Sequence, residues 1–418
     1  MHEEKSNGSW QTVARQLQQR KRLALRITPA AERAVRSGHP WLFAEGITKQ
    51  SHNGRSGDLV VIFDRKNRFL AVGLYDPASP IRVRILQQGE AATVDGGWFG
   101  ERVETAVSHR TPHFNDQTTA YRLIHGENDG LPGLVVDKYD QTFVIKLYTA
   151  AWVPHLEPVI GQLEAMNPER IVLRLSRAVQ DDHAALHGLR DGQHLLGRPT
   201  DAVRFLENGL WFEADVVRGQ KTGFFLDQRE NRARLEELTA GKSVLNVFAY
   251  TGGFSLYAAR GGAVRVVSLD LSQPALATAV RNFKLNQHHT NVANAEHELL
   301  LGDAFRAMTQ LADGRQRFDV VVIDPPAFAK RQSEVAGALS SYGRLARLGV
   351  RLLRPGGQLI TASCSSRVTA TDFFQAVEQG VAAENCILGE VAHTFHAVDH
   401  PIGFPEGAYL KCLWARVR

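Results

Sequence analysis

The sequence feature that most constrains the fold is a predicted strand, tight turn and helix at residues 243–260. Residues 243–248 are apolar enough for a buried strand, and residues 254–260 have the composition of a helix. Gly252 and Gly253 lie between them, where backbone N–H groups can approach a ligand closely because neither residue has a side chain. A Gly-Gly turn also occurs as simple packing, so this unit alone predicts an α/β sheet and leaves its ligand undecided.

Three acidic residues follow in the order expected for a cofactor site. Asp270 ends the strand predicted at 264–269, Asp303 begins a turn, and Asp324 ends a buried strand at 318–323. An acid about twenty residues after the glycine turn suits the ribose hydroxyls of an adenosine. Because no Gly-x-Gly-x-x-Gly accompanies it, the pattern favours S-adenosylmethionine over a dinucleotide. The order resembles class I methyltransferases, with a Rossmann-like, mostly parallel, doubly wound sheet, over residues 220–418.

Composition places the chain among globular proteins of several domains. Its 418 residues are enough for two or three domains, and 44% of them are hydrophobic. No apolar run approaches the roughly 18–20 residues that span a bilayer, and the N-terminus lacks a signal-peptide core. Three cysteines do not make a disulfide framework. We therefore expect a cytoplasmic protein with no membrane partner and no metal site.

The positive charge is unevenly distributed along the chain. Residues 1–110 hold 17 Lys and Arg against 11 Asp and Glu, whereas the remainder holds 32 against 33. The net charge of +5 therefore comes from the N-terminal quarter. This asymmetry fits a polyanion partner such as RNA, and it fits a solvated basic face equally well.

The N-terminal part predicts a polar extension at residues 1–20 and a small β-rich domain at 21–97. That domain resembles a PUA domain, a β-barrel of RNA-modifying enzymes, in the turn 39–43, the strand start at 57–58 and the strand end at 73–75. The alternative is a small barrel that only supports the rest of the chain. Four basic residues are candidates for RNA phosphates, or for the solvated surface of the barrel: Lys21, Arg22, Arg82 and Arg84.

Residues 98–200 predict a central α+β domain, and residues 201–418 the methyltransferase domain. Within the central domain, residues 121–130 have the composition of a polar, turn-rich loop. Its charged residues favour a structural role over a catalytic one. Residues 178–200 predict a mobile connection.

Cys364 is the candidate nucleophile. It ends the strand predicted at residues 358–366, and the carboxyl ends of parallel strands meet at one crevice, so it should lie near Asp324. A free cysteine is usually a small buried hydrophobe, but Cys364 has serines on both sides. Carbon 5 of a pyrimidine is a poor nucleophile until a thiolate adds to carbon 6, which is covalent catalysis. Asp324 would hold the N3 edge of the base and favour the adduct.

The whole set of motifs is similar to the PUA-containing bacterial 23S ribosomal RNA cytosine-carbon-5 methyltransferases. The motifs are Gly-Phe-Phe-Leu-Asp-Gln-Arg at 223–229, the 246–254 loop, Asp-Pro-Pro-Ala-Phe at 324–328, Ser-Cys-Ser at 363–365 and the stretches 399–401 and 405–411. The resemblance implies an enzyme with S-adenosylmethionine as cofactor, 23S RNA as partner, and a homodimer left open. It implies cofactor contacts at Asp227, Arg229, Phe248, Tyr250, Thr251, Gly252, Gly253, Asp270, Asp303, Asp324 and Pro325, and catalysis by Cys364 and Asp324.

One departure and two alternatives accompany this interpretation. Many RNA cytosine-carbon-5 methyltransferases outside the group carry a second cysteine after the Asp-Pro motif, whereas this chain has Pro-Ala-Phe at 326–328. The base that removes the carbon-5 proton is therefore not identified. One alternative is methylation of an exocyclic amine on adenine or guanine, for which Cys364 would be idle. The other is a non-catalytic RNA-binding factor in ribosome assembly.

Overall fold

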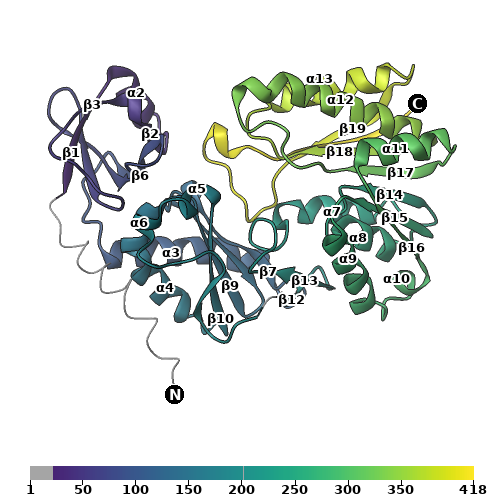
Figure 1. The fold of residues 1–418 in the computed structure, drawn as a ribbon, viewed down its shortest axis with the longest axis horizontal. Helices are drawn as coiled ribbons and strands as arrows, with labels where there is room; N and C mark the ends of the chain where they lie inside the picture. Colours follow the sequence, from purple (N-terminus) through teal and green to yellow (C-terminus); the bar gives the residue numbers. More distant parts are fainter. Residues whose placement is uncertain (1–21, 201) are drawn as a thin grey trace. The chain divides into compact units, whose positions relative to one another are not determined.

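The structure, a computed structural model, describes residues 22–200 and 202–418 (Figure 1). The chain forms two units. The first unit contains the residues up to Leu206, together with Ala214–Phe224 and Val398–Phe404. The second unit contains Glu207–Glu213, Phe225–Ala397 and Pro405–Arg418. The predicted extension at 1–20 and the candidate Lys21 lie outside the described residues.

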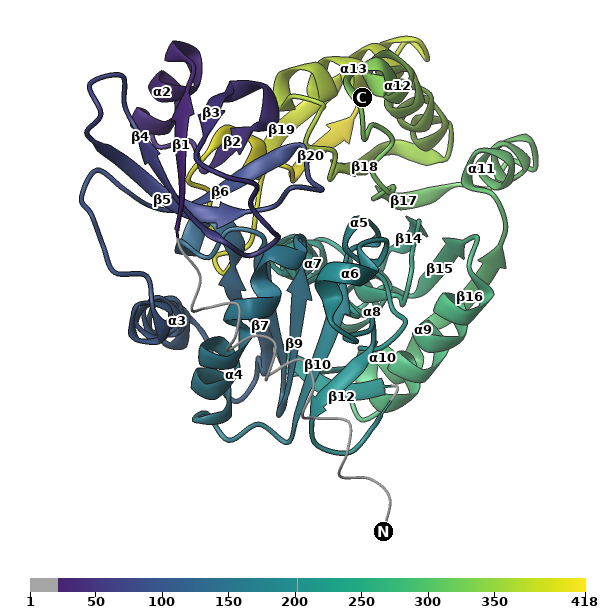
Figure 2. The same cartoon turned by 60° about the vertical axis from the view of Figure 1, so that its left-hand side comes forward.

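Residues 22–88 of the first unit form a six-stranded sheet with the order β2-β6-β5-β4-β1-β3 (Figure 2). Strand β1 pairs with β4 in parallel, and its other neighbour β3 is antiparallel. The short helix α2 (Pro29–Arg36) begins after Thr28, whose side chain accepts a hydrogen bond from the backbone of Ala31. The strands are β1 (Leu23–Ile27), β2 (Trp41–Phe43), β3 (Ile47–Gln50), β4 (Leu59–Phe63), β5 (Phe69–Tyr75) and β6 (Ile81–Gln88).

Residues 96–196 form a second sheet with the order β11-β10-β9-β8-β7. Strands β9 and β10 are parallel, whereas β8 and β9 form an antiparallel hairpin. Two helices, α3 (Gly96–Arg110) and α4 (Leu156–Glu164), pack with this sheet in one core that also contains Val72 and Leu74 of β5. The strands are β7 (Ala120–His125), β8 (Leu134–Tyr139), β9 (Thr142–Leu147), β10 (Arg170–Leu175) and β11 (Gln193–Leu196).

Two predictions for this region are wrong. Residues 120–125 are not loop but the buried strand β7, and only residues 126–129 form a short 3-10 turn. Their polar composition resembles a turn, but the charged side chains are buried against partners on other strands. Residues 177–196 contain two short helices and a strand, α5 (Arg177–Gln180), α6 (His183–Leu186) and β11. The apolar Val179, Leu186 and Leu189 join the core, which orders this connection.

A separate two-stranded sheet consists of β12 (Ala202–Glu207) and β13 (Leu210–Asp215). Within the described residues, no helix is long and apolar enough to cross a membrane.

Residues 243–417 of the second unit form a seven-stranded sheet with the order β16-β15-β14-β17-β18-β20-β19. The strands from β16 to β18 are mutually parallel, whereas β20 is antiparallel to both of its neighbours. The predicted mostly parallel doubly wound sheet is confirmed. The strands are β14 (Ser243–Val247), β15 (Arg265–Asp270), β16 (Glu296–Leu301), β17 (Phe318–Ile323), β18 (Leu353–Ser363), β19 (Leu388–Thr394) and β20 (Lys411–Val417).

Helices cover this sheet in two layers (Figure 1). One layer contains α7 (Arg229–Glu236), α8 (Gly253–Arg260), α9 (Gln273–Leu285) and α10 (Thr290–Asn294). The other contains α11 (Ala304–Asp313), α12 (Val335–Arg351) and α13 (Ala370–Ala382). The central parallel strands β14, β15 and β17 are largely buried because helices cover both of their faces, whereas the edge strand β16 is partly exposed. Their carboxyl ends carry the candidate site residues.

Candidate active site

The loop between β14 and α8 has an unusual backbone. Phe248, Tyr250 and Gly252 all have positive φ, at 62°, 48° and 78°. A non-glycine residue in this region costs roughly 1–2 kcal/mol, so the surrounding structure must hold the loop. Asp270 at the end of β15 does so, because its carboxylate accepts hydrogen bonds from the backbone of Tyr250 (2.7 Å) and of Ser272 (2.8 Å).

The same loop has capacity for a polar ligand. Thr251 is 6% exposed, and its Oγ1 is buried with no hydrogen-bond partner within the described chain. A buried hydroxyl left without a partner costs about 1–3 kcal/mol, which a bound ligand would recover. Asp270 is only partly buried and retains acceptor capacity beyond its two backbone hydrogen bonds. These two residues therefore fit the adenosine cofactor that the sequence predicts.

The remaining predicted cofactor residues have different surroundings. Asp227 is buried and accepts a hydrogen bond from the Tyr409 hydroxyl at 2.8 Å. Arg229 is buried at the start of α7. Asp303 is exposed and caps α11 by accepting from the backbone of Arg306 at 3.0 Å. Gly253 is the first residue of α8, at the end of the loop in which the Tyr250 backbone N–H donates to Asp270.

Asp324 lies at the end of β17 in a chain of polar contacts. The Gln228 side-chain amide donates to the Asp324 carboxylate at 3.0 Å, and Asn231 donates to the Gln228 carbonyl oxygen at 2.6 Å. Thr394 in turn donates to Asn231, and Trp414 donates to Thr394 at 2.8 Å. The carboxylate is therefore oriented by Gln228, which lies just before α7 and is itself held by side chains of α7 and β19.

Cys364 lies beside the Asp-Pro-Pro motif, as predicted. Strands β17 and β18 are parallel neighbours, and the Cys364 Sγ is 3.9 Å from the Pro325 carbonyl oxygen. The thiol is only partly buried. The preceding Ser363 donates to the Tyr342 hydroxyl at 2.8 Å, and burial raises the pKa of Tyr342 to about 12. Tyr342 is therefore neutral at physiological pH.

The other cysteines do not resemble nucleophiles. Cys412 is fully buried in β20, and burial raises the pKa of its thiol. A raised thiol pKa lowers the thiolate population, which is the reactive form. Cys386 is partly buried near the end of α13, away from the strand ends that carry Asp324.

The sequence did not single out three residues that complete this site. Gln228 lies within the 223–229 motif, Tyr342 lies in α12, and Lys411 is the last residue of the 405–411 motif. Lys411 is 1% exposed, and burial lowers its pKa to about 8 although the charge on Cys364 opposes this effect. Only the tertiary pairing of β18 with β20 shows that Lys411 belongs here.

The candidate RNA residues of the first unit divide into exposed and buried side chains. Arg22 is exposed and Arg82 is half-buried. The prediction that Arg84 contacts phosphates is wrong, because Arg84 is 5% exposed and its guanidinium lies 3.7 Å from the Glu127 carboxylate. The face of β6 that carries Arg84 packs against residues of the central domain instead of facing solvent. The alternation of polar and apolar residues in the sequence of β6 could not show this.

An aromatic cluster lies beside the paired strands β2 and β6. Trp41 of β2 is paired in register with Arg84 of β6. Its ring contacts Phe404 at 5.2 Å and Phe43 at 6.3 Å between ring centres, both edge to face. The Trp41 indole donates to Glu127 at 2.8 Å, which fixes the ring. Phe43 is 38% exposed, so the cluster reaches the surface of the first unit.

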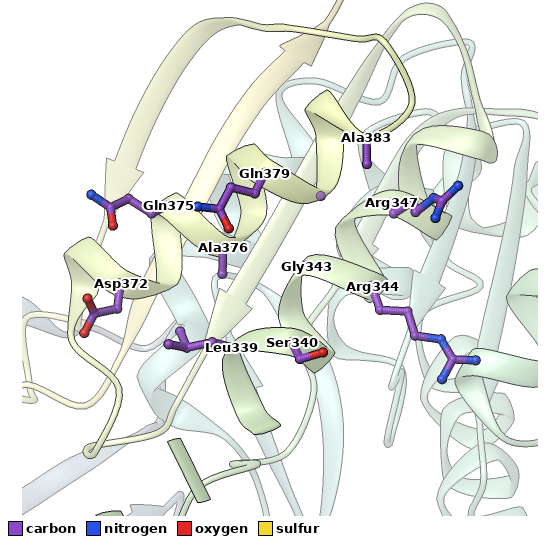
Figure 3. Close-up of a pocket in the computed structure, with 11 residues that line it drawn as sticks. Leu339, Ser340, Gly343, Arg344, Arg347, Asp372, Gln375, Ala376, Gln379 and Ala383 are labelled. Atoms are coloured by element: carbon purple, nitrogen blue, oxygen red, sulfur yellow. The ribbon is translucent and has the colours of Figure 1, made fainter. Parts of the chain in front are cut away.

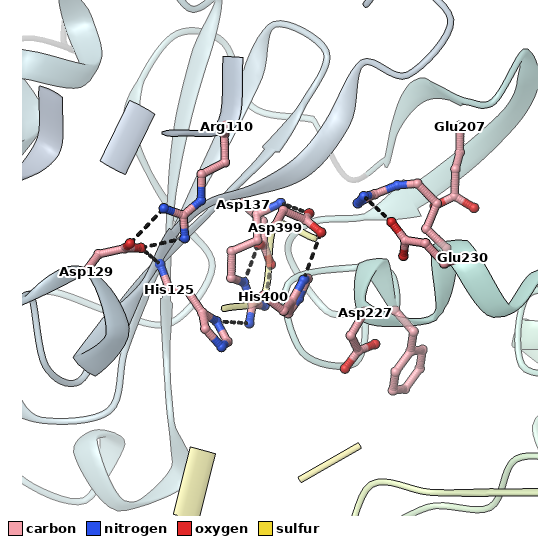
Figure 4. Close-up of polar contacts among 12 residues, drawn as sticks. Arg110, His125, Asp129, Asp137, Glu207, Asp227, Glu230, Asp399 and His400 are labelled. Atoms are coloured by element: carbon pink, nitrogen blue, oxygen red, sulfur yellow. Dashed lines mark hydrogen bonds and ion pairs between the residues drawn. The ribbon is translucent and has the colours of Figure 1, made fainter. Parts of the chain in front are cut away.

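A buried ionic network accounts for the charged residues of β7 (Figure 4). Arg122 donates to both oxygens of Asp137, at 2.7 and 3.0 Å. Its backbone N–H donates to Asp399 at 2.7 Å, and Asp399 contacts the ring of His400 at 3.1 Å. The His400 and His125 rings lie edge to face with centres 5.0 Å apart. These residues anchor Val398–Phe404 within the first unit, which is a structural role.

A surface groove of about 440 Å³ lies between α12 and α13 (Figure 3). It is lined by polar side chains such as Gln375 and Gln379, and by Arg344 and Arg347. The groove contains none of the predicted site residues. Among the described residues, no group of His, Cys, Asp and Glu has the arrangement of a metal site.

Comparison with known proteins agrees with this geometry. Residues 173–413 match a family described as S-adenosylmethionine-dependent methyltransferases, and residues 25–88 match a PUA-like domain. The chain belongs to the S-adenosylmethionine-dependent methyltransferases. The predicted PUA-containing family and its cofactor are thereby confirmed, and Thr251 and Asp270 fit that cofactor.

Curated relatives cover nearly the whole chain. A protein of Deinococcus radiodurans named ribosomal RNA large subunit methyltransferase is 45% identical, over 95% of this chain and 98% of its own. A protein of Pseudoalteromonas translucida named ribosomal RNA large subunit methyltransferase I is 35% identical, over 94% of this chain and 99% of its own. A solved methyltransferase structure from Streptococcus mutans has a TM-score of 0.79 at 22% identity, covering 94% of this chain and 99% of its own, which supports the fold.

Proposed function

We propose that this methyltransferase forms 5-methylcytosine in 23S ribosomal RNA through a covalent adduct of Cys364. The observation that carries the proposal is the position of the Cys364 thiol, 3.9 Å from the Pro325 carbonyl and next to Asp324. A methylated exocyclic amine would need no thiol there. The names of the relatives support large-subunit ribosomal RNA as the substrate.

S-adenosylmethionine supplies an electrophilic methyl group when it is bound. The Cys364 thiolate adds to carbon 6 of the cytosine, forming an S–C6 bond and moving the ring electron pair to carbon 5. The Asp324 carboxyl group would bring a proton to N3, which disperses the negative charge that develops on the ring of the adduct. After carbon 5 has been methylated, a water molecule or the Asp324 carboxylate accepts the carbon-5 proton. The C–H electron pair restores the C5–C6 double bond, and the S–C6 bond breaks to release the Cys364 thiolate.

We propose that Asp270 accepts from the ribose hydroxyls and that the 248–253 loop, with Thr251, encloses the methionine part. Asp227 and Arg229 would contact the polar end of that part, and Pro325 and Asp324 its methyl group. Support comes from the buried Thr251 hydroxyl and the constrained loop backbone. Asp303 is the least enclosed of the predicted contacts.

We propose that RNA binds across the exposed face of the six-stranded sheet. Arg22 and Arg82 would contact phosphates, and Phe43 would stack on an unpaired base. Stacking on an aromatic side chain contributes about 1–3 kcal/mol per base. Phe43→Ala should then weaken RNA binding by about 5- to 150-fold. Trp211→Ala is the matched control, because Trp211 is 37% exposed and lies in the second unit.

Salt dependence tests the phosphate contacts. Each phosphate neutralised by Lys or Arg contributes about −0.7 to −0.9 to the slope of log affinity against log salt. Affinity should therefore fall between roughly 50 and 200 mM salt, and Arg82→Gln should reduce the slope. An RNA affinity that did not change with salt concentration would contradict binding through phosphates.

Three free cysteines further support a reducing, cytoplasmic setting.

Nucleoside mass spectrometry tests the reaction. Ribosomal RNA is treated with S-adenosylmethionine and either the wild-type protein or Cys364→Ala. New 5-methylcytosine with the first and none with the second is the expected result. A methylated purine formed equally by both proteins would contradict the role of Cys364 and support amine methylation.

A further inference from the structure

The most informative feature outside the proposed reaction steps is a buried cation beside the nucleophile. Lys411 is the first residue of β20 and lies directly opposite Ser363 of β18, the residue before Cys364. Its ammonium donates to the carbonyl oxygens of Val368 (2.6 Å) and Tyr409 (3.1 Å), and to that of Ser365. The loop that begins at Cys364 therefore wraps around the Lys411 ammonium.

The charge of Lys411 is not balanced by an acid. An ammonium has three N–H donors, and here all three are directed at neutral carbonyl groups. No carboxylate pairs with it among the residues that the structure describes. A buried charge without a counter-ion is costly. A thiolate on Cys364 would supply the missing negative charge.

We propose that Lys411 is a positioning residue that favours the thiolate form of Cys364 and orients the loop carrying it. This inference rests on the proposed covalent role of Cys364. A cation close to an acidic group favours its charged form and lowers its pKa by about 1–3 units. The thiol proton passes to solvent, and the sulfur keeps the electron pair with which it attacks carbon 6.

Other groups around Cys364 do not supply this charge. The Tyr342 hydroxyl from α12 is neutral, since its pKa is raised to about 12 by burial. The Asp324 side chain at the end of β17 is a carboxyl group and carries no positive charge in any protonation state. Burial lowers the pKa of Lys411 to about 8, and the charge on Cys364 counteracts that effect. Lys411 is thus positive at neutral pH and loses this role as the pH rises above its own pKa.

The test measures the pKa of Cys364 directly, without RNA or cofactor. Iodoacetamide alkylation of Cys364 is followed against pH in a Cys386→Ser background, since Cys412 is fully buried. The parent protein should show a midpoint below the free-thiol value of about 8.5. Lys411→Met should raise the midpoint by at least about one unit, and Lys411→Arg should restore it.

Controls separate charge from structure. Tyr342→Phe removes a hydroxyl but no charge, so it should leave the alkylation midpoint unchanged. A parent midpoint at or above about 8.5 would overturn the inference even if Lys411→Met failed to fold. Equal midpoints in folded Lys411→Met and its parent would overturn it as well. If Cys364→Ala still made 5-methylcytosine while Lys411 lowered the thiol pKa, the proposed reaction would fail and the charge effect would stand.

Discussion

The strongest stability prediction concerns the buried ion pair of Glu207 and Arg232 in the second unit. Both Glu207 oxygens accept from the Arg232 guanidinium, at 2.7 and 2.6 Å, and neither side chain is more than 3% exposed. The Tyr257 hydroxyl also donates to Glu207 at 3.1 Å. Glu207→Gln removes the negative charge that accepts from two nitrogens of the Arg232 guanidinium, so the buried cation loses its bidentate carboxylate partner. Breaking such a pair costs about 3–5 kcal/mol.

Thermal unfolding gives the magnitude to be checked. A domain of about 150–250 residues loses about 2–4 °C of Tm per kcal/mol, so Glu207→Gln should lower Tm by about 6–20 °C. Arg232 also donates to the Phe225 carbonyl at 2.9 Å, at the start of the segment that carries Asp227. The variant should therefore also bind S-adenosylmethionine more weakly, as measured by calorimetry.

An exposed ion pair provides the matched control. Asp313 lies 3.2 Å from Arg351, and these side chains are 64% and 37% exposed. Exposed pairs contribute about 0–1 kcal/mol, so Asp313→Asn should change Tm by at most about 4 °C. If Glu207→Gln lowered Tm no more than Asp313→Asn, the reasoning about the buried pair would be refuted.

Three further predictions follow from individual contacts. Tyr409→Phe removes the hydrogen bond that orients Asp227, a proposed cofactor contact. Calorimetry should therefore show S-adenosylmethionine binding weakened by about 1.5–3 kcal/mol. Burial lowers the pKa of His297 to about 4, so stability should fall as the pH drops from about 6.5 towards 4, because the unfolded state binds the extra proton. His297→Gln should flatten this dependence in Tm measurements. Gly380→Ala should lower the free energy of unfolding by about 1–3 kcal/mol, because the added Cβ would overlap the Gly343 carbonyl oxygen of α12. An unchanged Tm would contradict this close packing of α12 and α13.

The sequence predicted the features of the site that depend on local pattern. The apolar strands and the Gly252 turn follow from periodicity and backbone freedom, and the order of Asp270, Asp303 and Asp324 follows from alternation of strands and helices. Because the carboxyl ends of parallel strands share one edge, the proximity of Cys364 to Pro325 could also be expected.

The features that sequence could not predict depend on partners far apart in the chain. Arg122 belongs to a strand because Asp137 and Asp399 satisfy its guanidinium and its backbone, which composition alone does not show. Arg84 is buried for the same reason, since Glu127 faces it. Lys411 became a candidate only when the antiparallel pairing of β20 placed it opposite Ser363.

The proposed reaction requires a covalent bond between the Cys364 sulfur and carbon 6 of a cytosine. A ribosomal RNA fragment containing 5-fluorocytidine tests it directly, because fluorine on carbon 5 cannot leave as a proton and the adduct persists. With S-adenosylmethionine present, the wild-type protein should give a protein–RNA species that survives denaturing electrophoresis, and Cys364→Ala should give none. An adduct with Cys364→Ala, or methylation of normal RNA with no trapped species from the fluorinated fragment, would contradict the account.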